Sequence, residues 1–244
     1  MKQQILTVKE NVLIAKDVYM MTLDGADTSG GVPGQFVNIK LDGFYLRRPI
    51  SVNDMDENSY RIIYKVVGKG TAAMAEYQPG VKLDTLTGLG NGFDPSLSGD
   101  KPLLIGGGVG VPPLYYLAKI LVAQGKTVTA VLGFNSKDDI ICKEDLEALG
   151  VKVYTSTVDG SEGIKGFVTD AMKSVGEYSY FYTCGPEPML KAVYNATVTS
   201  GELSFEERMG CGFGACMGCT CKTKYGNKRI CKDGPMLKKE EVIW

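Results

Sequence analysis

The sequence predicts a three-part fold: a small antiparallel β-barrel, a doubly wound parallel α/β domain and a short cysteine-rich module. Residues 1–98 contain many short strand-like runs separated by turn residues, which is typical of a barrel. Strand and helix patterns then alternate over residues 99–203, and this rhythm indicates a parallel sheet covered by helices. Residues 204–244 hold most of the cysteines and are too few to build a core without a staple.

The strands expected in the barrel are rich in β-branched and aromatic residues and are bounded by Gly, Pro, Asn or Asp. A short helix over residues 71–77 interrupts them, and residues 96–101 form the linker to the second part. The expected strands are residues 5–8, 12–15, 19–23, 35–41, 60–67 and 82–86.

In the second part a helix is expected after each strand, and Gly125 and Gly150 end the first two helices. The expected strands are residues 102–105, 127–132, 151–155 and 180–183. The expected helices are residues 112–124, 143–149, 167–175 and 186–200.

The composition is that of an ordinary globular protein, with 44% hydrophobic and 23% charged residues. A formal net charge of −1 gives no basic field for nucleic acid or an anionic membrane. The absence of histidine excludes Ser-His-Asp catalysis, histidine-ligated zinc and a Rieske centre. The longest apolar stretch, residues 103–123, contains glycines and prolines, which favours strand, turn and helix over a membrane span. The polar start and the seven cysteines favour the cytoplasm, where clustered cysteines usually bind metal.

Four cysteines near the C-terminus follow a C-x4-C-x2-C…C spacing, which is typical of plant-type [2Fe–2S] clusters held by four thiolates. Glycines at 210, 212, 214 and 218 let the backbone wrap a cluster and direct N–H groups at sulfur. A four-cysteine zinc site is the alternative, although zinc modules usually carry paired C-x2-C units. Cys221 is expected not to be a ligand, because its sulfur lies a full two-residue step beyond Cys219. The expected ligands are Cys211, Cys216, Cys219 and Cys231.

Two glycine motifs mark a nucleotide site in the second part. The run Gly106-Gly-Gly-Val-Gly110 follows a strand and opens a helix, where N–H groups and the helix dipole favour a diphosphate. A tight structural turn is the alternative. No arginine cluster follows the next strand, which favours NAD over NADP. Cys184-Gly-Pro186 ends the last strand, where open α/β sheets bind ligands, although a lone cysteine can also be a small buried hydrophobe.

A further pair of motifs lies in the barrel. Arg48 can hold a diphosphate with two parallel hydrogen bonds, and Ser51 supplies a hydroxyl in the same strand. Thr71 is expected to cap the short helix, whose N-terminus would face the same anion. An edge strand with solvated arginines is the alternative interpretation.

The order of these motifs resembles that of the ferredoxin–NADP reductase superfamily, and in particular the electron-transfer subunits of NAD-dependent dihydroorotate dehydrogenases. The resemblance covers essentially the whole chain and rests on R-P-I-S, G-K-G-T, G-G-G-V-G-V-P-P-L, C-G-P and the cysteine spacing. Its most specific stretches are residues 205–211 and 231–235. One departure is Ile50, which stands where the superfamily's usual R-x-Y-S/T has an aromatic residue.

The resemblance implies that the barrel binds FAD, the sheet binds NAD and the cysteine module holds the cluster. It places Arg48 at the FAD diphosphate and Ser51 near the flavin N5, with Ser51 and Cys184 as catalytic residues. The implied FAD-binding residues are Arg48, Pro49, Ile50, Ser51, Ile63, Tyr64, Lys65, Gly70 and Thr71. The implied NAD-binding residues are Gly106, Gly107, Gly108, Gly110, Cys184, Gly185 and Pro186.

The resemblance also implies a partner: an FMN-containing catalytic subunit that oxidises dihydroorotate in pyrimidine biosynthesis, in a heterotetramer of two plus two chains. Electrons would pass from that subunit through the cluster and FAD to NAD+. Met209, Phe213 and Met217 flank the cysteines and would form a docking surface, unless they are ordinary core residues.

Two other functions remain open. One is the flavin and iron–sulfur subunit of a sulfide dehydrogenase or of a ferredoxin-dependent NAD(P) transhydrogenase, although an aspartate is expected at the position of Cys211 in such a relative. The other, from a different class, is a nucleotide-binding interaction protein whose tail is stapled by zinc.

Overall fold

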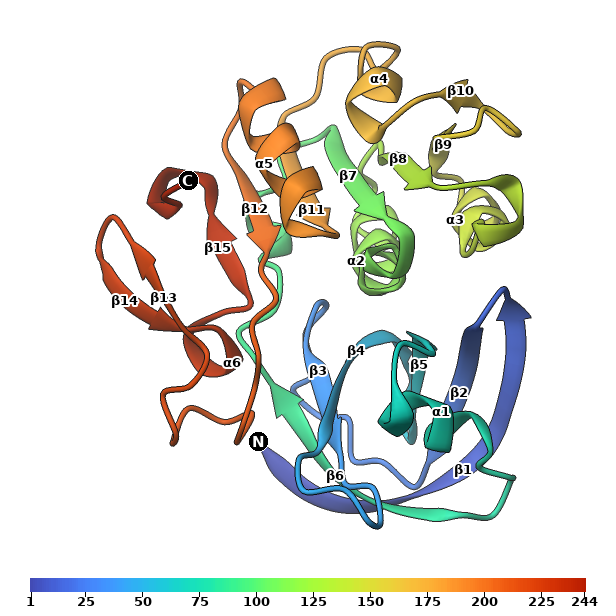
Figure 1. The fold of residues 1–244 in the computed structure, drawn as a ribbon. Helices are drawn as coiled ribbons and strands as arrows, with labels where there is room; N and C mark the ends of the chain where they lie inside the picture. Colours follow the sequence, from blue (N-terminus) through green and yellow to red (C-terminus); the bar gives the residue numbers. More distant parts are fainter.

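The computed structural model describes residues 1–244 and confirms the predicted fold class. A closed six-stranded barrel and a seven-stranded sheet form the two larger parts. The C-terminal segment lies beside both of them, shown in red in Figure 1. The chain begins in the barrel, and its C-terminal segment returns to pack against both larger parts.

The barrel strands are antiparallel and follow the order β1-β2-β5-β4-β3-β6. Residues predicted as two strands at 5–8 and 12–15 form one continuous strand of 14 residues. One short helix, α1 (Lys69–Ala75), follows β5. The strands are β1 (Lys2–Ala15), β2 (Val18–Asp24), β3 (Phe36–Ile39), β4 (Arg48–Met55), β5 (Ser59–Lys65) and β6 (Lys82–Leu89).

The sheet has the order β10-β9-β8-β7-β11-β12-β15, with every neighbouring pair parallel except β12 and β15. The strands are β7 (Pro102–Gly107), β8 (Thr129–Phe134), β9 (Lys152–Thr157), β10 (Ile164–Lys165), β11 (Tyr180–Cys184), β12 (Gly201–Ser204) and β15 (Met236–Lys238). The helices are α2 (Pro112–Ala123), α3 (Lys143–Ala148), α4 (Val168–Met172) and α5 (Glu187–Ala196). Short 3-10 turns occur at Pro95–Leu97, Gly108–Gly110, Lys137–Asp139 and Lys239–Glu241.

Alternating side chains of the sheet build two cores. Leu104 of β7 packs in one core with α2 and α3, whereas Leu103 and Ile105 pack in the other with α4 and α5. Helices thus cover both faces, as the near-continuous apolar strands require. The apolar stretch 103–123 divides into β7, the glycine turn and α2. None of the helices in the structure has both the length and the apolar character needed to cross a membrane.

The last expected helix of the sheet, residues 186–200, was predicted too long. Helix α5 ends at Ala196, and Thr197 is already extended, at φ −90° and ψ 142°. The β-branched residues Thr197, Val198 and Thr199 follow, and such residues favour extended backbone. The chain then returns as β12, which pairs with β11 on one side and β15 on the other.

The C-terminal segment contributes a hairpin and a strand to the rest of the fold. The hairpin is β13 (Thr220–Thr223) and β14 (Gly226–Arg229), followed by α6 (Ile230–Asp233) and by β15 at the edge of the sheet. Ile230 packs in a core that also contains Phe36 of the barrel and Leu203 of the sheet. Consequently the segment has no separate core and is anchored on both larger parts.

A buried carboxyl group in β12 makes the stability of the fold depend on pH. Glu202 is 5% exposed, and its Oε2 accepts the N–H of Asp94 at 3.0 Å. Burial raises the pKa of Glu202 to about 7 from its ordinary value near 4.5. The folded state therefore holds this proton to higher pH than the unfolded chain, so stability falls as pH rises from about 4.5 to about 7.

The variant Glu202→Gln should abolish this loss, because glutamine keeps an acceptor for the Asp94 N–H but carries no charge. We expect its free energy of unfolding to exceed that of the unmodified chain by up to about 3 kcal/mol near pH 8. Near pH 4 the two proteins should be equally stable. Denaturant titrations at both pH values measure the difference, and an equal effect at both would contradict the assignment.

Candidate functional site

The barrel opens between β4 and β5 at the residues predicted to bind a flavin. Strand β4 pairs with β3 from Arg48 to Ser51, but it pairs with β5 only from Val52 onward. Strand β5 pairs with β2 up to Lys65, but its pairing with β4 stops at Ile62. The facing backbone edges of residues 48–51 and 63–65 thus lack ladder partners. They are free to hydrogen-bond a flat ring placed between them.

The two barrel motifs meet at Arg48. Its guanidinium lies over Gly70 in the first turn of α1, so closely that a Cβ on Gly70 would be 2.1 Å from Arg48 Nε. The Phe44 ring, with its centroid 5.0 Å from Cζ, also supports the guanidinium. Arg47 points elsewhere and pairs with Asp84 at 3.0 Å. Arg48 and the start of α1 therefore form one cationic corner suited to a diphosphate.

Thr71 takes part in capping α1, but from within the first turn and not as the N-cap residue. Gly68 is the N-cap residue, and Thr71 is the third residue of the helix. The Thr71 hydroxyl accepts the backbone N–H groups of Val67 at 2.9 Å and Gly68 at 3.3 Å. It thereby fixes the loop that enters the helix, and the loop in turn places Gly70 beneath Arg48.

The glycine turn of the sheet packs directly on the Cys184 motif. A Cβ on Gly110 would lie 2.4 Å from the carbonyl oxygen of Cys184, so only glycine allows this approach. Cys184 itself is 4% exposed and shares a core with Val111 and with Ile63 of the barrel. Burial raises the pKa of its thiol to about 12, while a hydrogen bond with the Ser204 side chain lowers this pKa by a smaller amount. Burial thus favours the protonated form of the Cys184 thiol.

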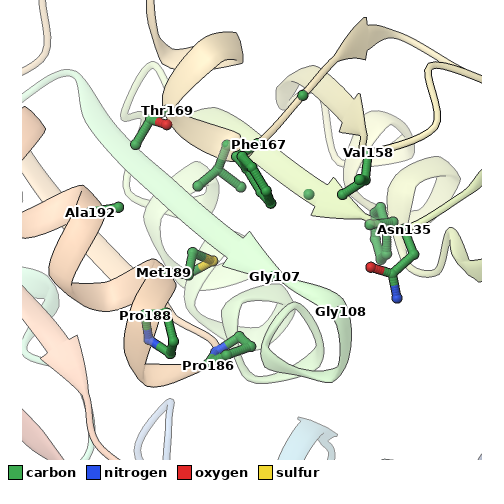
Figure 2. A pocket seen from close by; sticks show the side chains of 14 residues that line it. Gly107, Gly108, Asn135, Val158, Phe167, Thr169, Pro186, Pro188, Met189 and Ala192 are labelled. Atoms are coloured by element: carbon green, nitrogen blue, oxygen red, sulfur yellow. The ribbon is translucent and has the colours of Figure 1, made fainter.

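A cavity of about 460 Å³ lies at the carboxyl ends of the central strands (Figure 2). Of the residues expected to bind NAD, Gly107, Gly108 and Pro186 line this cavity, whereas Gly106, Gly110, Cys184 and Gly185 do not. Phe167 borders the cavity and is 66% exposed. Its aromatic face is therefore accessible for stacking with a nucleotide base. The lining residues that sequence reasoning missed are Gly133, Phe134, Asn135, Val158, Gly166, Phe167, Val168, Thr169, Pro188, Met189 and Ala192.

Most of these missed residues share one signal, because they end or directly follow strands or lie at the starts of helices. Asn135 follows β8, Val158 follows β9, and Phe167 precedes α4. The rule that open sheets bind ligands outside their carboxyl ends would have identified them once the strands were assigned.

The four predicted cluster cysteines come together as two pairs. The Cys216 N–H points at Cys211 Sγ at 3.4 Å, and the Cys231 N–H points at Cys219 Sγ at the same distance. All of the cysteines are free thiols, and no three His, Cys, Asp or Glu side chains form a closed metal-binding group in this conformation. Cys219 and Cys231 are buried, whereas Cys216 is exposed at the tip of the loop.

Backbone N–H groups of the loop stabilise the thiolate of Cys211, the first of the predicted ligands. Burial opposes ionisation of Cys211, but N–H groups of Cys216, Phe213 and Ala215 outweigh it and lower the pKa of Cys211 to about 6. Burial and the neighbouring Cys219 raise the pKa of Cys231 to about 12, so its ionisation depends on a bound metal. Positive φ angles at Gly212 and Gly214 turn the backbone around the sulfurs. A four-thiolate donor set surrounded by backbone N–H groups fits an iron–sulfur cluster.

Cys221 lies apart from the two pairs. It sits in β13, paired with Lys228, and borders a second cavity with Phe205, Glu207 and Trp244. Burial and the Glu207 carboxylate raise the pKa of the Cys221 thiol. Its place in the β13–β14 hairpin, outside the two pairs, is consistent with a thiol outside the ligand set.

The variant Cys221→Ser should accordingly keep a complete cluster. The expected result is an unchanged iron and sulfide content and an unchanged EPR signal after reduction. Loss of that signal would show that Cys221 replaces one of the four expected ligands.

The cluster loop rests on the barrel next to the open edge. Asn38 of β3 donates from Nδ2 to the Cys211 carbonyl at 3.4 Å, and a Cβ on Gly212 would lie 2.3 Å from that nitrogen. Strand β3 pairs with β4 along Arg48 to Ser51, on the edge of β4 opposite to the open one. The cysteine loop thus lies one strand away from the open edge.

The chain combines a loop with four cysteine thiols, a barrel whose strands β4 and β5 separate at one end, and a dinucleotide-type sheet. Together these define an NAD-linked iron–sulfur oxidoreductase of the ferredoxin reductase type. The family model for the iron–sulfur cluster binding domain of dihydroorotate dehydrogenase B matches residues 206–243. The oxidoreductase NAD-binding domain matches residues 104–195. The chain belongs to the family of dihydroorotate dehydrogenase B (NAD(+)) electron transfer subunits.

Relatives and solved structures agree with this assignment. The Fusobacterium nucleatum dihydroorotate dehydrogenase B (NAD(+)), electron transfer subunit, is 46% identical over 257 residues, covering 99% of each chain. A chain of an NADH-dependent reduced ferredoxin-NADP oxidoreductase superposes with a TM-score of 0.89 at 31% identity, over 99% of this chain and 90% of that one. The FAD/NAD binding domain of a nitric oxide dioxygenase from Vibrio cholerae has a TM-score of 0.69 at 20% identity, over 79% and 91% of the two chains. That last likeness supports the fold alone.

Proposed function

We propose that this chain takes electrons from a dihydroorotate-oxidising partner at a [2Fe–2S] cluster and delivers them through FAD to NAD+, in pyrimidine biosynthesis. The observation that carries the proposal is the position of the cysteine loop. It contacts β3 through Asn38 and Gly212, one strand away from the open β4 edge, while Ile63 beside that edge shares a core with Val111 after the glycine turn. The open part of the barrel therefore lies between an electron entrance and a nucleotide site.

The three parts take separate tasks in this proposal. Residues 1–98 bind FAD, residues 99–203 bind NAD, and residues 204–244 bind the cluster. When bound, the cluster supplies one-electron transfer, and FAD connects it to the two-electron chemistry of NAD. The residues assigned to FAD are Arg48, Pro49, Ile50, Ser51, Ile63, Tyr64, Lys65, Gly70 and Thr71, and those assigned to the cluster are Cys211, Cys216, Cys219 and Cys231.

Residues of the chain orient these groups rather than react with them. Arg48 neutralises the diphosphate, and the free backbone edges of β4 and β5 hold the ring. Ser51 offers a hydroxyl at the end of the open edge. The neutral Cys184 thiol fills the space behind the glycine turn without adding charge. The nucleotide occupies the cavity beside Gly107, Gly108 and Pro186.

A docking surface for the partner surrounds the cluster loop. Cys216 is exposed, and the apolar side chains of Phe213 and Met217 beside it are 41% and 54% exposed. Met209 is half-buried and packs in the core, so it contributes less. An exposed ligand ringed by apolar side chains suits a one-electron contact with an FMN-containing subunit. A heterotetramer of two plus two chains and a cytosolic location, where thiols stay reduced, belong to the proposal.

The alternatives are less well supported. The structure with a TM-score of 0.89 belongs to a ferredoxin-NADP oxidoreductase, but its identity of 31% is lower than the 46% of the Fusobacterium relative. A zinc staple is disfavoured because the matching family model for residues 206–243 describes an iron–sulfur cluster binding domain.

Co-expression with the FMN-containing dihydroorotate oxidase of the same organism tests the proposal. The purified complex should contain FAD, FMN, iron and sulfide, and dihydroorotate should reduce NAD+ only when both chains are present. Replacing dihydroorotate with reduced ferredoxin is the matched control. NAD(P)+ reduction by ferredoxin without any by dihydroorotate would overturn the proposal in favour of the transhydrogenase alternative.

A further inference from the structure

We propose that two buried asparagines of the barrel, Asn38 and Asn53, are positioning residues that hold the cluster loop and the nucleotide sheet in place relative to the flavin edge. Each side chain is 1% exposed. Each extends from a barrel strand to a backbone carbonyl of a different part of the chain. The inference rests on the proposed function, because it assigns roles in the two electron-transfer steps of that function.

Asn53 connects the flavin strand to the nucleotide helix. It lies on β4 two residues beyond Ser51, and its Nδ2 donates to the Pro112 carbonyl at 3.0 Å. Pro112 is the first residue of α2, directly behind the glycine turn. The Oδ1 of Asn53 accepts from Arg61 Nε at 2.7 Å, which fixes the amide within the barrel. One amide thus spans the distance between the open edge and the start of the nucleotide helix.

The backbone of β4 is shaped for this contact. The pairing of β4 with β5 shifts between Val52 and Asp54, so Asn53 is the extra residue of a β-bulge. A bulge re-aims one side chain out of the alternation of a strand, and bulges are frequent beside active sites. Around it, Asp54 pairs with Lys119 of α2 at 3.0 Å, but the Lys119 side chain is 43% exposed. Asn53 is the buried member of this interface.

Asn38 makes the corresponding contact on the cluster side. Its Nδ2 donates to the Cys211 carbonyl, and Gly212 packs against the same nitrogen. Within β3, Val37 and Ile39 fill the barrel core, while Phe36 packs in the core that contains Cys219 and Cys231. By the alternation of the strand, Asn38 shares the face of Phe36. The amide therefore connects β3, the strand paired with Arg48 to Ser51 of β4, to the backbone of a predicted ligand.

Folding alone does not account for asparagine at position 38. Its Oδ1 is buried without a hydrogen-bond partner. An unpaired buried acceptor lowers stability, and an apolar side chain of the same shape would remove that cost. A side chain kept at the expense of stability, in contact with the cluster loop, indicates a role in holding that loop.

The variant Asn53→Asp tests the first contact. Aspartate still accepts from Arg61, but it places a carboxylate oxygen against the Pro112 carbonyl and so breaks the link to α2, together with a longer contact of 4.0 Å from Nδ2 to Cys142 Sγ. We expect flavin reduction at saturating NADH to slow about tenfold with KM for NADH unchanged, because geometry and not binding is altered. Amide hydrogen exchange should accelerate in residues 106–116. The serine of Asn53→Ser is too short to reach Pro112, so this variant should slow flavin reduction in the same way. Lys119→Met is the control and should leave the rate of flavin reduction unchanged.

The variant Asn38→Leu tests the second contact. It is uncharged and similar in shape, so its Tm should equal or exceed that of the unmodified chain. We expect slower electron transfer from reduced flavin to the cluster, an altered EPR line shape and faster amide exchange in residues 210–216. Flavin reduction by NADH should keep its normal rate. A lowered Tm with an unchanged transfer rate and line shape would overturn the role of Asn38.

The two variants together separate this inference from the proposed function. Stopped-flow mixing of each FAD- and cluster-loaded protein with NADH follows flavin and cluster signals in one experiment. The inference requires Asn53→Asp to lower the rate constant of flavin reduction, with the cluster signal delayed to the same extent, and Asn38→Leu to lower only the rate constant of transfer from flavin to cluster. An unchanged rate constant in either variant, or slower flavin reduction in Asn38→Leu, overturns it. Failure of the unmodified protein to bind FAD and a cluster would instead overturn the proposed function.

Discussion

The variant Cys216→Ser should lose the cluster and with it all NAD+ reduction driven by the partner subunit. Cys216 is expected to supply one of four thiolates, and a serine hydroxyl is a much weaker ligand for iron in such clusters. Its Sγ already lies close to Gly210 and Gly218, and its N–H points at Cys211 Sγ. The substitution therefore removes a ligand from the centre of the loop.

The same variant should retain FAD and the fold. Cys216 is exposed, whereas Cys219 and Cys231 belong to a core shared with Phe36 of the barrel. The exchange of sulfur for oxygen thus leaves that core intact. NADH should still reduce an artificial two-electron acceptor through FAD at close to the normal rate.

Iron analysis, EPR after reduction and the two activities check this expectation. Cys221→Ser is the matched control, since it makes the same exchange in the neighbouring strand and should preserve every signal. Normal NAD+ reduction by the partner in Cys216→Ser would show that the ligand set is wrong.

The sequence predicted the sites better than it predicted how they meet. The cysteine spacing and the glycine runs are local patterns, because a cluster or a diphosphate requires particular residues within a few positions. The opening of the barrel is different in kind. It depends on where the pairing of β4 with β5 stops and on the bulge at Asn53, and such register is set by partners distant in sequence.

The errors at the end of the sheet have a similar cause. Strand β12 has only four residues, and it exists because β11 and β15 pair with it from both sides. The start of α1 was predicted at Thr71, although the helix begins at Lys69. Sequence patterns define helix ends only to within one or two residues, because local backbone geometry decides them. The position of Cys184 at a strand end predicts a place near the nucleotide site, but its burial behind the glycine turn depends on the packing of Gly110 and could not be predicted from that position.

The variant Arg48→Ala should weaken FAD binding roughly ten- to a hundredfold, the effect of losing hydrogen bonds from a charged donor to a diphosphate. The guanidinium is held ready by the Phe44 ring and by the Leu46 carbonyl, which accepts from Nη1. Little order has to be gained when the anion binds, so its removal should cost most of that interaction. Fluorescence titration of the flavin-free chain with FAD measures the loss.

Two further variants decide whether Arg48 acts through its position. Gly70→Ala keeps the arginine but would place a Cβ 2.1 Å from its Nε, so the guanidinium must move and FAD should again bind more weakly. Arg47→Ala removes the adjacent positive charge, which is paired with Asp84, and should leave the FAD affinity unchanged. Equal weakening by Arg47→Ala and Arg48→Ala would indicate a general electrostatic effect. Weakening by Arg48→Ala and Gly70→Ala alone would identify the corner formed by β4 and α1 as the diphosphate site.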